Sequence, residues 1–265
     1  MATYKKRGYK PKPVKENIEN EPEVAAEEMD STTAEVFDTL DETAGKTEEW
    51  VAANQKYIFI VVGVLALFAL GYIAYDRFVQ EPKEIESANE IYQAEQYFVQ
   101  AQEAPATQKD SLYTLALEGG EGKLGLVDVA DQYGSTNNGN VANYFAGMAY
   151  LHLKDYKRAI EYLDEYESED YITQALAYGG LGDAFAQVEE NGVSSESLDY
   201  YQKAANLDKN SFTTPMFLLK AGKMAMALND KSTAVSSFEK IVTEYPKSNE
   251  YLEAESLLAQ AQSLK

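Results

Sequence analysis

Acidic side chains are the only groups in this chain numerous enough to suggest chemistry. Neighbouring carboxylates can act as general acid and base or bind a divalent cation. Two clusters could do so, Asp164/Glu165 and Glu167/Glu169/Asp170. Neither cluster has the spacing of a calcium-binding loop. Carboxylates this abundant usually form the solvated face of a helix, and we interpret both clusters in that way.

Other catalytic groups are scarce. The chain has no cysteine, which excludes disulfides, thiol catalysis and thiolate metal sites. Its one histidine, His152, is expected to be an exposed residue on a helix. The segment Gly119-Gly120-Glu121-Gly122 superficially resembles a phosphate-binding loop, but it lacks the GK[ST] ending and is predicted to be a turn. We therefore predict no enzyme activity, no catalytic residue, no metal site and no cofactor.

The charge of the chain also limits its partners. The formal net charge is −21, and residues 76–265 carry 15 Lys/Arg against 31 Asp/Glu. A domain this acidic repels a phosphate backbone, so nucleic acid is not an expected partner. The acidity can also serve solubility alone.

An uncharged apolar stretch, Tyr57–Tyr75, divides the chain into a short tail and a long domain. As a helix it would span roughly 28 Å, close to the hydrocarbon thickness of a bilayer. It begins too late for a cleaved signal peptide, and no small-residue cleavage site follows it. We predict an uncleaved transmembrane helix at 57–75, with Gly63 and Gly71 on one face as a hypothetical docking face for another membrane helix.

The region before this stretch is expected to be cytoplasmic. Residues 1–31 begin with a basic block, continue into an acidic one, and are predicted to be a disordered tail. Residues 32–56 are predicted to form an amphipathic juxtamembrane helix, whose apolar face is Phe37, Leu40, Ala44, Thr47 and Val51. The Lys/Arg of the whole tail place the N-terminus in the cytoplasm and residues 76–265 outside it.

Internal repeats organise the second half of the chain around Gly147, Gly182 and Gly222. The first and third glycines are followed, twelve and sixteen residues later, by a small and then a bulky residue. In the middle unit these residues are displaced by a short insertion. The pairs are Ala159 and Leu163, Ser197 and Tyr201, and Ala234 and Phe238. The pattern resembles the tetratricopeptide repeat, a helix–turn–helix unit.

This resemblance implies an all-α solenoid of helix pairs after a single transmembrane helix. We expect repeats near 141–172, 175–208 and 215–247, and a capping helix at 249–264 that shields the last pair. Residues 134–140, GSTNNGN, are expected to break the chain before the first repeat.

The resemblance also implies a protein-binding groove, because the first helix of each tetratricopeptide pair lines the concave face. Carried over by motif position, the groove residues are Tyr144, Met148, Leu151, Leu176, Asp183, Ala186, Met216, Leu219, Lys223 and Met226. This face is apolar and rich in methionine, which suits adaptable contacts. The alternative is that some of these side chains merely pack between pairs.

The whole layout resembles the YfgM-type family of bacterial membrane proteins. Segments such as NVANYFAGMAYLHLKDYKRAIEYL, GGLGDAF and FTTPMFLLKAG carry the resemblance. It implies an ancillary subunit of the SecYEG-type translocon in the bacterial inner membrane, with a periplasmic domain. The implied partners are a periplasmic prolyl isomerase-like chaperone and emerging secreted chains. A scaffold for envelope assembly or cell division is the alternative, and an enzyme that uses acidic residues is a third class.

Overall fold

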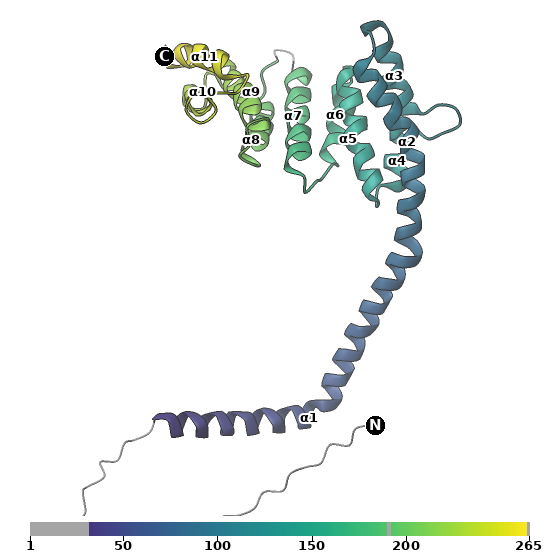
Figure 1. Ribbon diagram of the computed structural model, residues 1–265, viewed down its shortest axis with the longest axis vertical. Coiled ribbons are helices and arrows are strands. Elements are labelled where there is room, and N and C mark those ends of the chain that lie inside the picture. Colours follow the sequence, from purple (N-terminus) through teal and green to yellow (C-terminus); the bar gives the residue numbers. More distant parts are fainter. Residues whose placement is uncertain (1–31, 190–191, 264–265) are drawn as a thin grey trace, which may run out of the picture. The chain divides into compact units, whose positions relative to one another are not determined.

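The computed structural model describes residues 32–189 and 192–263 of the chain. Within these ranges every regular element is a helix (Figure 1). The predicted tail, residues 1–31, lies outside the described residues, and so do the side chains of residues 32–48. The structure therefore leaves the predicted apolar face of residues 32–56 as a prediction.

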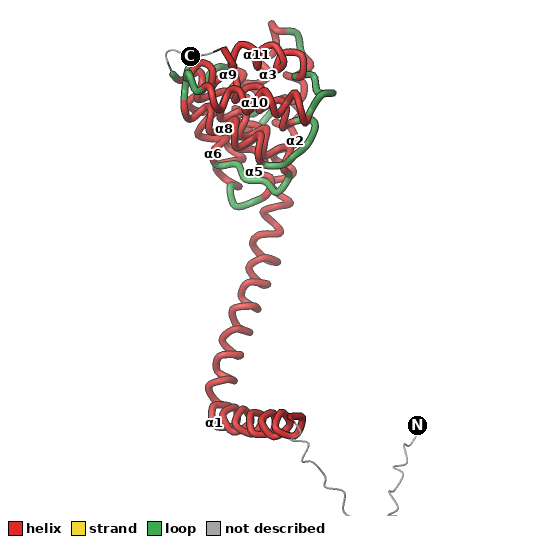
Figure 2. The backbone as a smooth tube through the Cα atoms, turned by 90° about the vertical axis from the view of Figure 1, so that its left-hand side faces the viewer, coloured by secondary structure: helices red, strands yellow, loops and turns green. Residues whose placement is uncertain are grey.

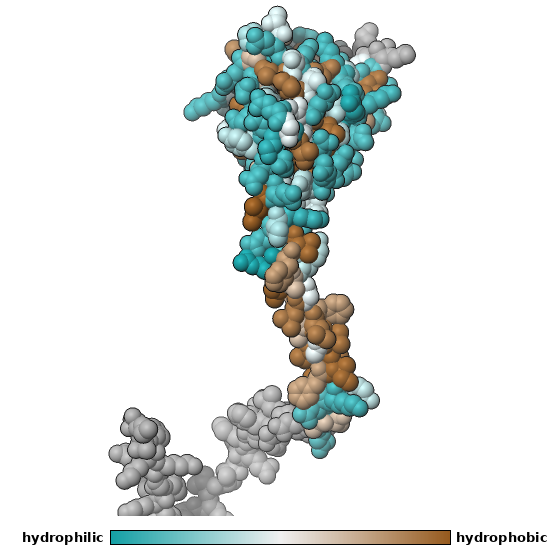
Figure 3. Space-filling model, turned by 90° about the vertical axis from the view of Figure 1, so that its right-hand side faces the viewer, coloured by the Kyte–Doolittle hydropathy of each residue, from teal (hydrophilic) through white to brown (hydrophobic). Residues whose placement is uncertain are grey.

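The first helix, α1 (Thr32–Tyr75), contains the whole apolar stretch. It is followed by a π-helical turn, η1 (Asp76–Gln80), and by α2 (Glu81–Glu103). By length and composition, the helical segment Glu49–Glu103 is the one span candidate among the described residues, with a mean hydropathy of 2.5 in its most apolar window. None of that window is buried, and apolar side chains gather along this helix (Figure 3). By length and composition, this helix could cross a membrane.

A second unit, Phe68–Lys265, holds the remaining helices, which are joined by short loops (Figure 2). Successive helices pack in pairs, and each pair packs on the next. Before the repeats lie α2, α3 (Ala106–Glu118) and α4 (Leu126–Tyr133). The pairs are α5 (Asn137–His152) with α6 (Tyr156–Asp164), α7 (Tyr171–Val188) with α8 (Ser195–Asn206), and α9 (Thr213–Ala227) with α10 (Lys231–Glu244).

The last helix, α11 (Tyr251–Ser263), packs on the third pair. Its inner side is Ala254 and Ala261, both fully buried, whereas Glu253 and Glu255 are exposed. This one-sided burial covers the apolar end of the array, as a terminal helix of a solenoid must.

The predicted break at 134–140 is shorter than expected, because only residues 134–136 lie outside the helices. Helix α5 begins at Asn137, before the expected residue 141. Thr136 is its N-cap, since the Thr136 hydroxyl accepts a hydrogen bond from the Gly139 amide at 3.0 Å. A threonine cap overrides the weak helix propensity of the following Asn and Gly residues. The other glycine-rich segment, 119–122, is the expected turn, and it follows helix α3 rather than a strand.

The repeat glycines lie where the two helices of a pair cross. A Cβ atom added to Gly147 would lie 2.5 Å from Leu163 Cγ, and one added to Gly182 would lie 2.5 Å from Tyr201 Cε1. Both separations are far below van der Waals contact. The third pair has the same contact between Gly222 and Phe238. The glycine and the bulky residue are therefore complementary in shape, and this complementarity explains their fixed spacing.

The turns inside the first and third pairs are also equivalent. Lys154 and Asn229 adopt φ angles of +63° and +60°. In the first turn the amide of Asp155 donates to the Tyr150 carbonyl at 2.9 Å, and the amide of Lys154 donates to the Leu151 carbonyl at 3.2 Å. These two bonds are the Schellman pattern that ends a helix. The next residue, Asp155 or Asp230, then caps the second helix.

Candidate binding surfaces

The first helices of the three pairs carry all ten predicted groove residues. On α5, Tyr144, Met148 and Leu151 are half-buried. The Tyr144 ring lies 5.1 Å from the Tyr166 ring. Met148 and Leu151 face Gly180 of α7, where an added Cβ would lie 3.2 Å from Met148 Sδ. These side chains therefore contribute to the packing between the first and second pairs as well as to the surface.

On α7, Asp183 belongs to a junction of three helices. Its carboxylate accepts a hydrogen bond from Tyr201 of α8 at 2.7 Å. It also pairs with the ammonium group of Lys220 of α9 at 2.6 Å. Leu176 is half-buried and Ala186 is buried. Asp183 therefore links successive pairs, and its charge is compensated within the array.

On α9, the predicted residues divide into packed and exposed ones. Leu219 is buried, and Met216 and Met226 are half-buried against the core of the C-terminal pairs. Lys223 is exposed, and its ammonium group lies 2.6 Å from the Glu253 carboxylate of α11. The structure thus puts these residues on the first helices but gives most of them packing partners. Their role as a groove remains a proposal.

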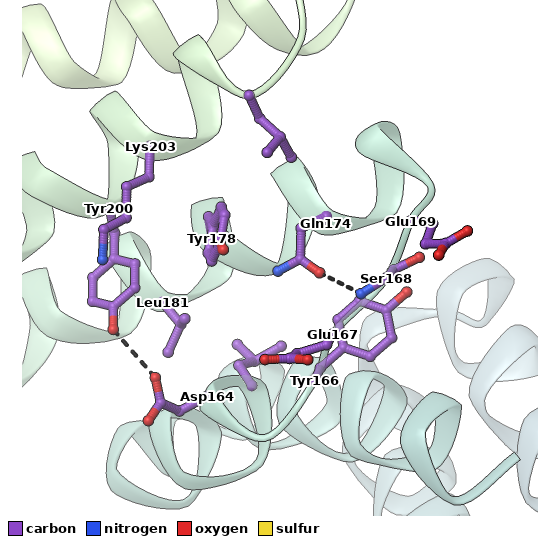
Figure 4. Close-up of a pocket in the computed structure, with 12 residues that line it drawn as sticks. Asp164, Tyr166, Glu167, Ser168, Glu169, Gln174, Tyr178, Leu181, Tyr200 and Lys203 are labelled. Atoms are coloured by element: carbon purple, nitrogen blue, oxygen red, sulfur yellow. Dashed lines mark hydrogen bonds between the residues drawn. The ribbon is translucent and has the colours of Figure 1, made fainter. Parts of the chain in front are cut away.

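A separate cleft of about 620 Å³ lies beside α7 (Figure 4). It is bounded by the end of α6, by the segment that follows α6, and by α8. The apolar part of its lining includes Leu163 and Leu181. Helix α6, whose end borders the cleft, has 9 residues, whereas α8 has 12 and α10 has 14. Gln174, Tyr178 and Leu181 of α7 form another part of the lining.

The segment after α6, which forms one wall of the cleft, is held in place by side-chain hydrogen bonds. The side-chain amide of Asn140 makes two hydrogen bonds with the backbone of Glu167. Its Nδ2 donates to the Glu167 carbonyl at 2.6 Å, and its Oδ1 accepts from the Glu167 amide at 3.1 Å. The Ser168 amide donates to Gln174 Oε1 at 2.7 Å. Asp170 then caps α7 by accepting from the Ile172 amide. The rim of the cleft is therefore ordered, although it contains no regular structure.

Aromatic and acidic groups converge on this cleft. Tyr178 and Tyr200 lie with their ring centroids 6.2 Å apart. The Tyr200 hydroxyl donates to Asp164 at 3.3 Å. Burial raises the pKa of Tyr200, and the charge of Asp164 raises it further, so the phenol stays protonated at neutral pH. The ammonium group of Lys203 lies 4.5 Å from the centre of the Tyr200 ring, a cation–π geometry.

None of the ten predicted groove residues lines this cleft. Sequence reasoning did single out the acidic residues of the clusters at 164–170, but it interpreted them as a solvated helix face. One signal in the sequence could have indicated that these residues lie in a loop. Asp170 is a capping residue that marks the start of α7, so α6 must end before it. Nothing local in the sequence indicates that α8 packs beside the segment that follows α6.

Among the described side chains, those of residues 49–189 and 192–263, no group of three His, Asp or Glu residues could hold a metal ion. His152 stacks on Tyr113 with ring centroids 4.6 Å apart. Partial burial lowers the pKa of His152, and the charge of Lys109 lowers it further, so the ring is neutral at pH 7.

Comparison with known protein families identifies the repeat. The tetratricopeptide repeat family model matches residues 217–248, which cover most of α9 and all of α10. No curated protein and no solved structure matches the chain. The fold is thus the expected all-α tetratricopeptide solenoid, a class of domain that acts in protein interaction.

Proposed function

We propose that this chain is a single-pass membrane protein whose tetratricopeptide domain is a non-catalytic scaffold for partner proteins. One observation carries the proposal: the chain that contains the repeat array also contains a helix whose apolar side chains have no cover within the described residues. Such a helix is stable in a bilayer. The anchor would then concentrate the repeat domain at the membrane surface.

We further propose that the partners belong to secretion. In this scheme the anchor contacts helices of a SecYEG-type translocon through the face of Gly63 and Gly71. No side chain lies within 4 Å of a Cβ atom added at either glycine, so the face is open to a neighbouring helix. The repeat domain would hold a periplasmic prolyl isomerase-like chaperone or an emerging chain through the first helices, where Met216 and Met226 provide adaptable apolar contacts.

Membrane topology can be tested with single cysteines, because the chain has none of its own. Ser236→Cys introduces a thiol at an exposed position of α10. A membrane-impermeant maleimide should label this variant in intact cells. Thr3→Cys, in the N-terminal tail, should be labelled only after permeabilisation. The opposite pattern would place the repeat domain in the cytoplasm and end the proposal of a periplasmic scaffold.

The partners can be tested by photocrosslinking in native membranes from Met148 and from Met226. Crosslinks to translocon or chaperone subunits are expected at these two positions. A crosslinker at Glu239, exposed on α10, is the matched control and should give none. Crosslinks to division or envelope-assembly proteins instead would leave the scaffold in place and remove the role in secretion.

A further inference from the structure

A side-chain amide nitrogen that has no acceptor in the described structure opens onto the cleft beside α7. Gln174 is only 6% exposed. Its Oε1 accepts from the Ser168 amide, which can only donate, so the orientation of the side-chain amide is determined. Its Nε2 group makes no hydrogen bond among the described residues and points into the cleft (Figure 4). This Nε2 group can therefore donate to an acceptor that enters the cleft, and a peptide carbonyl group is the acceptor that proteins most often supply.

The charges around the cleft select a cation. Three carboxylates line it, those of Asp164, Glu167 and Glu169, against the single ammonium group of Lys203. The carboxylate of Glu167 points into the cleft (Figure 4) and makes no ion pair within the described part of the chain. The strongly acidic domain adds a long-range attraction for cations.

The aromatic rings of the cleft also favour a cationic ligand. The Tyr200 ring is already covered by Lys203 and stacked on Phe185, and its contact with Lys203 is an example of the cation–π geometry that a tyrosine ring offers. Tyr178, which is half-buried, adds a second ring that can pack against the charged group and the methylene groups of a long basic side chain. A lysine or arginine side chain matches both the carboxylates and this ring.

We propose that this cleft binds an extended peptide segment of a partner protein and receives its lysine or arginine side chain. The basic side chain lies between Glu167 and the Tyr178 ring, and Gln174 Nε2 donates to a backbone carbonyl of the peptide. The inference rests on the proposed scaffold function, but it assigns the contact to a surface on the side of the second helices, away from the first-helix groove.

The test uses the full chain in detergent and fluorescent peptides with blocked ends. The probe is a nonapeptide of alanine, leucine and glycine with one central lysine, and the matched probe has glutamine in its place. Fluorescence anisotropy should show at least about fivefold weaker binding of the glutamine peptide. Binding of the lysine peptide should weaken further as salt is raised. Equal affinity for the two peptides, or no binding of either, would overturn the proposal.

Charge reversal then locates the site. Glu167→Lys should weaken binding of the lysine peptide about tenfold. The fold should survive, because Asn140 holds the backbone of Glu167 and not its side chain. Glu161→Lys, an equal charge change at an exposed position of α6, is the control and should weaken binding less than about twofold. Equal losses in the two variants would show that only the net charge matters, and the site would be rejected.

Mapping separates this inference from the scaffold function. A photoreactive group beside the lysine of the peptide should crosslink to residues 163–207. Crosslinks confined to α5 and α9 would refute the cleft and still support a scaffold that binds through its first helices. The crosslinks from Met148 and Met226 in membranes test the scaffold function, and their result does not depend on this peptide experiment.

Discussion

The ring of Phe238 lies directly against the Cα atom of Gly222. A Cβ atom at position 222 would come within 3 Å of three ring carbon atoms, two of them Phe238 Cζ and Cδ1. Phe238 is fully buried, so its ring cannot move aside without disturbing the core of the third pair. This contact joins α9 to α10, and the space it leaves admits only glycine at position 222.

Gly222→Ala should therefore destabilise the repeat domain by about 1–3 kcal/mol through overpacking. Chemical denaturation in detergent, followed by circular dichroism, measures the change. Gly71→Ala is the matched control, because no atom lies within 4 Å of its added Cβ. An unchanged midpoint in Gly222→Ala would mean that the crossing is loose.

Ser197→Ala should stabilise the domain by about 1 kcal/mol. The Ser197 hydroxyl oxygen is buried and finds no hydrogen-bond partner among the described residues. The equivalent positions in the other two pairs are Ala159 and Ala234, both fully buried. Thermal unfolding would detect the gain. Ser236→Ala, at an exposed position of α10, should shift stability by less than about 0.5 kcal/mol, and an equal gain there would contradict the explanation.

Tyr201 should make the domain sensitive to alkaline pH. Burial raises the pKa of its phenol, and the neighbouring charge of Asp183 raises it further. A raised pKa in the folded state means that folding favours the neutral phenol. This contribution is fully present below the unfolded pKa of about 10 and is lost as pH rises through the higher folded pKa.

In Tyr201→Phe the free energy of unfolding should therefore decrease less steeply above pH 10 than in the wild type. At pH 7 the same change should cost about 1 kcal/mol, because the hydrogen bond to Asp183 is lost. Denaturant titrations from pH 7 to 11 give both numbers. A residual slope should remain from Tyr162, whose pKa burial raises to about 12. A variant with the wild-type slope would show that Tyr201 does not contribute.

Lys154→Gly should raise stability by about 0.5–1 kcal/mol. Lys154 has a φ of +63°, a conformation that a side chain with a Cβ adopts at a cost and that glycine adopts freely. Asn229→Gly tests the equivalent turn and should gain less, since asparagine tolerates this conformation better. The melting temperatures of the two variants decide the order, and a larger gain at Asn229 would be contrary to it.

Much of the fold was predictable because its signals are local. The spacing from Gly147 to Leu163 reflects one helix, a short turn and a second helix, so it survives as a pattern along the chain. The start of α5 was predicted too late because residues 134–140 are rich in Gly and Asn, which are poor helix formers, and the capping role of Thr136 was not recognised. The groove positions followed from the repeat, but the pairing of Lys223 with Glu253 joins two helices whose orientation no local pattern specifies.

By itself, the sequence determined that the chain is all-α, that it has one uncovered apolar helix, and that its repeats cross at glycines. Each of these depends on the period of a helix or on the size of a residue at fixed spacing. Only the tertiary structure decided where the polar groups converge. The cleft lies where the end of α6, the segment after it, α7 and α8 meet, and this meeting brings Gln174, Glu167 and Tyr200 to one place. Such convergence depends on how separate helices pack, and the packing of the whole array sets it.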